Sequence, residues 1–83
     1  MQLLYFAWVR ERIGTGEETV APPESVRTVA DLAKWLQARS AGHAEALADL
    51  AKLRAAVDQR FVPIDSDLGE AKEVAFFPPV TGG

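Results

Sequence analysis

The chain begins with an uninterrupted apolar stretch, residues 3–9, that is rich in aromatic side chains. A short apolar run of this kind predicts a strand whose two faces are both at least partly covered. Residues 14–16 supply turn glycines, and residues 18–20 predict a second strand that returns beside the first. The prolines at positions 22 and 23 end that strand, because proline cannot donate to a β-ladder. The opening pattern therefore predicts a β-hairpin.

The next apolar residues recur at helical spacing. Thr28 is a good N-cap, and Asp31 three residues later approximates a capping box. The apolar positions that follow share one helical face: Val29, Leu32, Ala33 and Leu36. We expect this helix to pack that face on the sheet and to be broken by residues 40–42.

The second half of the chain predicts a further helix and two more strands. An alanine-rich segment, from residue 43 to about residue 53, is typical of a helix. Residues 55–62 return to strand-like composition and end at Pro63, and residues 73–77 form the last predicted strand. One main helix on a small mixed sheet predicts an α+β domain.

Composition fits one small globular domain of 83 residues. The chain has no cysteine, which excludes disulfides, thiolate metal sites and a catalytic thiol, and fits a reducing compartment. No apolar run has the length of a membrane span. The net charge is −3, with the acidic excess in residues 55–83. We expect a cytoplasmic protein that binds neither nucleic acid nor membrane; the charge fits a basic protein partner or a merely soluble surface.

The side chains offer little chemistry of their own. His43 is the only histidine, and its place among alanines predicts a surface residue. Asp65 and Asp67 lie in a turn, where aspartate usually bonds the backbone. No nucleophile and base are paired in the sequence, and no set of ligands indicates a metal or a permanently bound cofactor. The chain is therefore predicted not to be a catalyst on its own.

The C-terminal segment is the most unusual feature. Residues 1–77 are predicted to form the domain, and residues 78–83 an extended tail, because Pro78 and Pro79 cannot join the ladder. An extended tail of that length spans roughly 20 Å, and a tip of two glycines fits a narrow channel. Its distinctive group is the carboxylate of Gly83, which is ionised at neutral pH and a poor electrophile. Chemistry there needs activation by another protein, for example as an acyl-adenylate.

Two segments of the sequence resemble a known family. Residues 73–83, Glu-Val-Ala-Phe-Phe-Pro-Pro-Val-Thr-Gly-Gly, and residues 6–11, Phe-Ala-Trp-Val-Arg-Glu, are similar to the molybdopterin synthase small subunits, the MoaD family. These proteins are ubiquitin-like β-grasp sulfur carriers, so the resemblance implies that fold here. Asp58 stands where many members of the family have asparagine.

The resemblance also implies a mechanism and partners. An activating enzyme would use ATP to adenylate the Gly83 carboxylate, and a sulfur donor protein would supply the sulfur of a thiocarboxylate. The tail, with Pro78, Pro79, Val80, Thr81 and Gly82, would insert into the large synthase subunit in a heterotetramer. The thiocarboxylate would then donate sulfur to precursor Z and form the dithiolene of molybdopterin.

Strand alternation predicts where such partners would bind. If Leu3, Tyr5, Val74 and Phe76 face the helix, the aromatic residues Phe6, Phe61 and Phe77 are left on the open face of the sheet. The resemblance places partner contacts at these positions. The structural alternatives are that loops or the alanine-rich segment cover these side chains, or that they are scattered apolar surface.

Other functions fit the same ending. The chain could carry sulfur for thiamine or cysteine synthesis instead. A ubiquitin-like protein modifier would use Gly83 to form isopeptide bonds with lysines. An interaction module with an inert tail is the remaining alternative.

Overall fold

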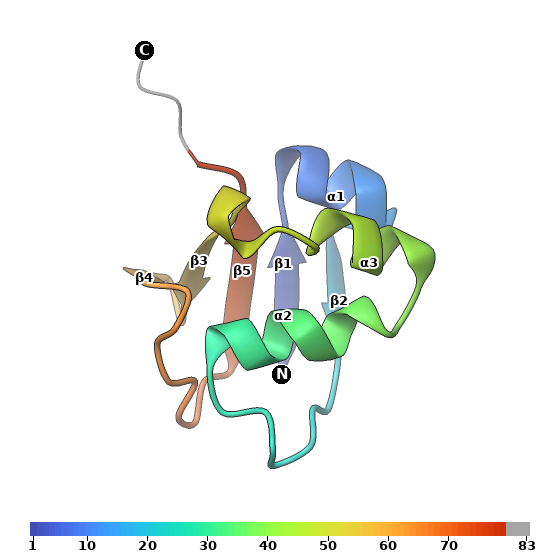
Figure 1. Ribbon diagram of the computed structural model, residues 1–83. Helices are drawn as coiled ribbons and strands as arrows, with labels where there is room; N and C mark the ends of the chain where they lie inside the picture. The colour runs from blue at the N-terminus through green and yellow to red at the C-terminus, as the bar shows by residue number, and fades with distance from the viewer. Residues whose placement is uncertain (80–83) are drawn as a thin grey trace.

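The computed structural model describes residues 1–79, which form a five-stranded mixed sheet in the order β2-β1-β5-β3-β4 (Figure 1). The strands are β1 Gln2–Tyr5, β2 Glu17–Thr19, β3 Arg54–Val57, β4 Arg60–Val62 and β5 Glu73–Phe77. Strand β5 lies in the middle, parallel to β1 and antiparallel to β3. The first and last strands of the chain are therefore neighbours at the centre of the sheet.

The helices are α1 Ala7–Ile13, α2 Val29–Gln37 and α3 Ala41–Ala46, followed by the 3₁₀ turn η1 Leu50–Lys52. In Figure 1, α2 and α3 lie across one face of the sheet, and α1 lies at the end of β1. The core joins that face to the helices through fully buried side chains, including Leu3, Tyr5, Val74 and Phe76 from the sheet and Leu32 and Leu36 from α2. The predicted α+β class is confirmed, as is the prediction of which side chains face the helix.

The predicted strand at residues 3–9 is too long. It ends at Tyr5, and residues 7–13 form the helix α1. Ala7 has a left-handed backbone (φ 53°), which turns the chain out of the sheet directly after β1. Val9 is buried and Ile13 packs against the core at the helical i+4 spacing. An apolar run this short does not distinguish strand from helix by periodicity. The predicted antiparallel pairing of the first two strands is confirmed, but the helix α1 connects them in place of a simple hairpin turn.

The predicted strand at residues 55–62 is two strands, β3 and β4, joined at Asp58 and Gln59. Both residues have positive φ (48° and 70°), the geometry of a tight hairpin turn. Asp58 Oδ1 accepts hydrogen bonds from the backbone N–H groups of Lys72 (2.9 Å) and Glu73 (3.0 Å). The side chain thus ties the hairpin to the start of β5. Because only an acceptor oxygen is used, asparagine would serve equally well at this position.

The main helix α2 begins as predicted, with a complete capping box between Thr28 and Asp31. The second helix differs: α3 begins at Ala41, with Ser40 as its N-cap, and η1 replaces its expected last turns. Gly42 therefore lies inside a helix rather than breaking one. A Cβ at Gly42 would lie 2.3 Å from the carbonyl oxygen of Arg12, so glycine permits the close approach of α1 and α3.

Candidate functional site

The base of the tail is held at the centre of the sheet. Strand β5 ends at Phe77, whose antiparallel partner is Arg54 of β3, and the half-buried Pro78 and Pro79 follow. In Figure 1 the chain leaves the sheet at the end where α1 and η1 lie. The remaining predicted tail residues, Val80, Thr81, Gly82 and Gly83, lie outside the described residues. Their roles, and the division into residues 1–77 and 78–83, stay predictions.

The face of the sheet opposite the helices carries an apolar row. Leu4, Ala75, Ala56 and Phe61 are successive cross-strand partners through β1, β5, β3 and β4. The two alanines in the middle leave room, and a groove of about 400 Å³ runs over them. Its lining comes from Leu4, Phe6, Ala56, Gln59, Phe61, Glu73, Ala75 and Phe77. We call this surface the open-face groove.

The three aromatic residues predicted for the open face all line this groove. Phe61 is 84% exposed and Phe6 49%, and Phe77 is half-buried. Phe6 reaches the groove as the N-cap of α1, not as part of a long strand. Clustered apolar side chains on a small protein mark an interaction surface, because covering one phenylalanine is worth about 2 kcal/mol. Their role in binding a partner remains a prediction.

His43 is buried, and the prediction of a surface histidine is wrong. Its Nε2 lies 2.6 Å from Glu18 Oε2, and its Nδ1 lies 2.7 Å from Ser40 Oγ. The Tyr5 hydroxyl donates to the same Glu18 oxygen (2.7 Å), and Arg39 lies 3.3 Å from the other. This polar cluster joins β1 and β2 to the start of α3. No local signal announces it, because its members are far apart in sequence and meet only through packing.

Burial and hydrogen bonds shift two pKa values in the cluster. Burial raises the pKa of the Glu18 carboxyl, but the hydrogen bonds from His43 and Tyr5 and the charges of His43 and Arg39 outweigh it. The net result is a pKa below the ordinary value. Burial, with the hydrogen bond and charge of Glu18, strongly raises the pKa of the Tyr5 phenol. The cluster therefore contains an ionised carboxylate and a neutral phenol, and its contacts link the sheet to the start of α3.

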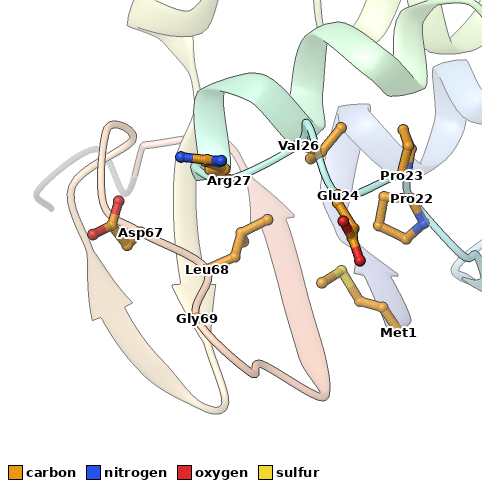
Figure 2. Close-up of a pocket in the computed structure, with 9 residues that line it drawn as sticks. All are labelled: Met1, Pro22, Pro23, Glu24, Val26, Arg27, Asp67, Leu68 and Gly69. Atoms are coloured by element: carbon orange, nitrogen blue, oxygen red, sulfur yellow. The ribbon is translucent and has the colours of Figure 1, made fainter.

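A second hollow lies near the starts of β1 and β5, at the opposite end of the sheet from Phe77 (Figure 2). It measures about 560 Å³ and lies among the start of β1, the loop before α2 and the turn before β5. The residues around it are Met1, Pro22, Pro23, Glu24, Val26, Arg27, Asp67, Leu68 and Gly69. Asp65 lies in a turn as predicted, whereas Asp67 does not: it forms a β-bridge with Thr28. The hollow contains no residue predicted for the tail or the open face.

Two other kinds of site are not found in the part of the chain that the structure describes. Within residues 1–79, no three histidine or acidic side chains come together as metal ligands. No helix over the same residues has the length and apolar character to cross a membrane.

Comparisons with known proteins agree with this geometry. Residues 3–83 match the ThiS family. The chain is 47% identical over 83 residues to the molybdopterin synthase sulfur carrier subunit of Escherichia coli K12, covering 100% of this chain and 99% of the relative. It is 37% identical over 91 residues to the protein of the same name from Haemophilus influenzae, with 100% and 99% covered.

Solved structures show the same fold. A putative molybdopterin converting factor subunit 1 from Pyrococcus furiosus superposes with a TM-score of 0.73 at 30% identity, over 95% of each chain. SAMP1 from Haloferax volcanii gives 0.67 at 24% identity, over 100% of this chain and 98% of the other, which bears on the fold alone. The predicted ubiquitin-like β-grasp fold is confirmed. Matched along almost its whole length, the chain belongs to the ThiS family.

Proposed function

We propose that this chain is the sulfur-carrier subunit of molybdopterin synthase. The observation that carries the proposal is the full-length match, at 47% and 37% identity, to two proteins that bear that name. The exposed groove beside the base of the tail supports it, because a carrier must dock before its tail can deliver anything. The same family includes carriers for other pathways, but no feature of the described residues favours one of them.

The proposed chemistry takes place at the carboxylate of Gly83. The activating enzyme consumes ATP, forms the acyl-adenylate and releases pyrophosphate. Sulfide released by a donor protein then attacks the carbonyl carbon, and the bond to AMP breaks, which leaves a thiocarboxylate with no change of oxidation state. The thiocarboxylate donates its sulfur to precursor Z, and two donations complete one dithiolene. ATP is thus a substrate of the activating enzyme, and the chain holds no permanent cofactor.

The chain's own residues position this group. Strand β5 is the central strand and is paired on both sides, so the tail starts from a restrained part of the sheet. Pro78 and Pro79 fix two φ angles directly after it and stiffen the departure. The open-face groove docks on the large subunit, which would supply the catalytic side chains within a heterotetramer. We infer a cytoplasmic setting, with no nucleic acid or membrane involved.

The proposal is tested by intact mass. The purified chain is incubated with its activating enzyme, ATP and a sulfur donor, and should gain the mass of one oxygen-to-sulfur exchange on its last residue. The chain that carries the thiocarboxylate should then, together with the large subunit, convert precursor Z to molybdopterin. A charged chain that supplies thiamine or cysteine synthesis instead would contradict the proposal, as would higher-mass lysine adducts as the main product in cell extracts.

A further inference from the structure

Arg54 is an exposed cation at the point where the tail leaves the sheet. It is the cross-strand partner of Phe77, the last residue before the two prolines. Its Nη1 donates to the carbonyl oxygens of Leu53 (2.9 Å) and Ala51 (3.4 Å), at the end of η1. Among residues 1–79, the ion pairs all involve Glu18, and none involves Arg54. The guanidinium is therefore held by neutral groups, with its charge uncompensated by any described carboxylate.

This arrangement suits the recognition of a carboxylate. A guanidinium carries five N–H donors in a planar fork that matches a carboxylate in a bidentate pair. Because Nη1 is already hydrogen-bonded to backbone carbonyls, the Arg54 side chain has lost part of its conformational entropy before a ligand binds. Binding a carboxylate therefore costs less entropy. Arg54 is thus preorganised beside the open-face groove, on the same face of β3 as Ala56.

The groove also has a charge direction. Glu73, at the start of β5, lines its other end, four residues or about 14 Å from Phe77. Asp58 lies at that end too, bonded to the Glu73 N–H. Arg54 therefore lies at the tail end of the groove and two carboxylates lie at the opposite end, with the cations Lys72 and Arg60 close to them in the chain. A partner with the reverse order of charges would be attracted in one orientation and repelled in the other.

We propose that the protein that receives the tail places a carboxylate side chain against Arg54 at the mouth of its channel, and that this pair sets the docking direction. The choice of the large synthase subunit as that protein rests on the proposed function. A phosphate ligand fits less well, because an extended tail would carry its tip roughly 20 Å away from Arg54. The anion within reach belongs to the partner's own surface.

Association kinetics with the large subunit test the inference. Arg54→Glu should lower the association rate constant about tenfold at low salt and flatten its dependence on salt. Arg54→Lys keeps the charge but loses the bidentate fork, so it should associate at nearly the normal rate and dissociate faster. Arg27→Glu is the matched control, since it makes the same charge change beside the far hollow and should bind like the wild type.

The partner's carboxylate is identified by charge-reversal variants of the large subunit that restore binding of Arg54→Glu. Acidic residues around the channel mouth of the large subunit are changed to lysine one at a time, and one of them should restore binding of Arg54→Glu while weakening the wild type. Thermal unfolding checks that each variant is folded, and Arg54→Gln replaces the glutamate variant if that one is not. If Arg54→Glu or Arg54→Gln binds with wild-type rates, the inference is wrong and the proposed function stands. If the wild-type chain does not bind the large subunit at all, both are wrong.

Discussion

The rings of Phe61 and Phe77 lie with their centroids 5.6 Å apart and their planes at 52°, although strand β3 separates the strands that carry them. They meet because Ala56, between them on the open face, is too small to keep them apart. Such a tilted pair is a favourable aromatic geometry. The most exposed aromatic side chain of the molecule is thereby held against the last residue of β5, beside the start of the tail.

Phe61 should be a major anchor for the large subunit. We expect Phe61→Ala to weaken binding by about 2 kcal/mol or more, roughly thirtyfold in Kd, because a well-packed aromatic at the centre of an interface contributes that much. The free energy of unfolding should change little, since the side chain is 84% exposed. Titration calorimetry measures the affinity, with Phe61→Leu as a control that keeps most of the apolar area. Wild-type affinity in Phe61→Ala would remove the groove from the mechanism.

Deleting Gly83 should abolish sulfur transfer and leave docking largely intact. The deletion withdraws the carboxyl by about 3.5 Å, and a misplacement of about 1 Å already costs on the order of a hundredfold in rate. Adding one residue after Gly83 should have the same effect. Gly82→Val should instead hinder insertion of the tail into a narrow channel. Single-turnover assays with the charged chain and the large subunit separate these cases, and normal transfer by the shortened chain would contradict the mechanism.

Glu18 should make the fold sensitive to acid. Its pKa is lower in the folded chain than the ordinary 4.5, so its contribution is complete above that pH and is lost as the pH falls through the folded value. Glu18→Gln should lower the free energy of unfolding at pH 7 by about 1–3 kcal/mol, because a charge-assisted acceptor is lost. Urea unfolding across the acid range should also show a flatter pH dependence in this variant. If the free energy of unfolding of this variant falls with decreasing pH as steeply as that of the wild type, groups other than Glu18 cause the acid sensitivity.

Tyr5 offers an independent readout at alkaline pH, because it is the only tyrosine in the chain. Its pKa is raised in the folded state, so the stability it confers is complete below the ordinary value of 10.0 and declines above it. Tyrosinate absorbance should therefore appear together with unfolding, as followed by circular dichroism in the same titration. Ionisation of the phenol in a chain that remains folded would show that the hydroxyl is not buried against Glu18.

The turn at Asp58 allows a test of one contact. Asp58→Asn should change the free energy of unfolding by less than about 0.5 kcal/mol, since the amide oxygen can accept the same two N–H groups. Asp58→Ala should cost about 2 kcal/mol or more, because it leaves both donors without that acceptor and places alanine at a positive φ. Urea denaturation of the two variants side by side provides the measurement. Equal losses in both would mean that the carboxylate charge, not the acceptor, stabilises the turn.

Gly42 should resist replacement even though it lies in a helix. Alanine would gain about 1 kcal/mol of helix propensity, but its Cβ would collide with the Arg12 backbone at 2.3 Å. Overpacking against backbone costs about 1–3 kcal/mol, so we expect Gly42→Ala to be destabilising or at best neutral, measured by thermal unfolding. The control Ala44→Gly, in the same helix, isolates the propensity effect. A clearly stabilised Gly42→Ala would show that α1 and α3 separate at little cost.

Sequence patterns predicted the elements whose signals are local. The capping box of Thr28 and Asp31 and the alternation of Val74 and Phe76 depend on neighbours in the chain, and both are present as expected. The predictions were wrong where tertiary packing determines the secondary structure. The chain turns into a helix at Ala7, which brings Val9 into the core, and Gly42 lies within α3, where its missing side chain lets α1 come close. Neither contact is visible from residues close in sequence.

The groove was only partly predictable for the same reason. Strand alternation predicted that Phe77 and Phe61 lie on the open face. The hairpin turn at Asp58 and Gln59 was not predicted, because it contains no glycine that would indicate a turn. The role of Arg54 depends on its register with Phe77 and on the carbonyls of η1, which only the folded chain brings together. The polar cluster around Glu18 likewise joins residues from three separate segments, around positions 5, 18 and 39–43.

The central position of β5 also has a mechanical consequence. Each time a carrier leaves its partner, any force on the tail acts along β5, which is paired with β1 on one side and β3 on the other, four residue pairs to each. Because the ladder bonds run across the strand direction, such a pull loads them in shear, and they must fail together rather than one after another. A tail on β4, at the sheet edge, could be peeled away pair by pair. A chain built in this way withstands a repeated pull on its own C-terminal end without its sheet coming apart.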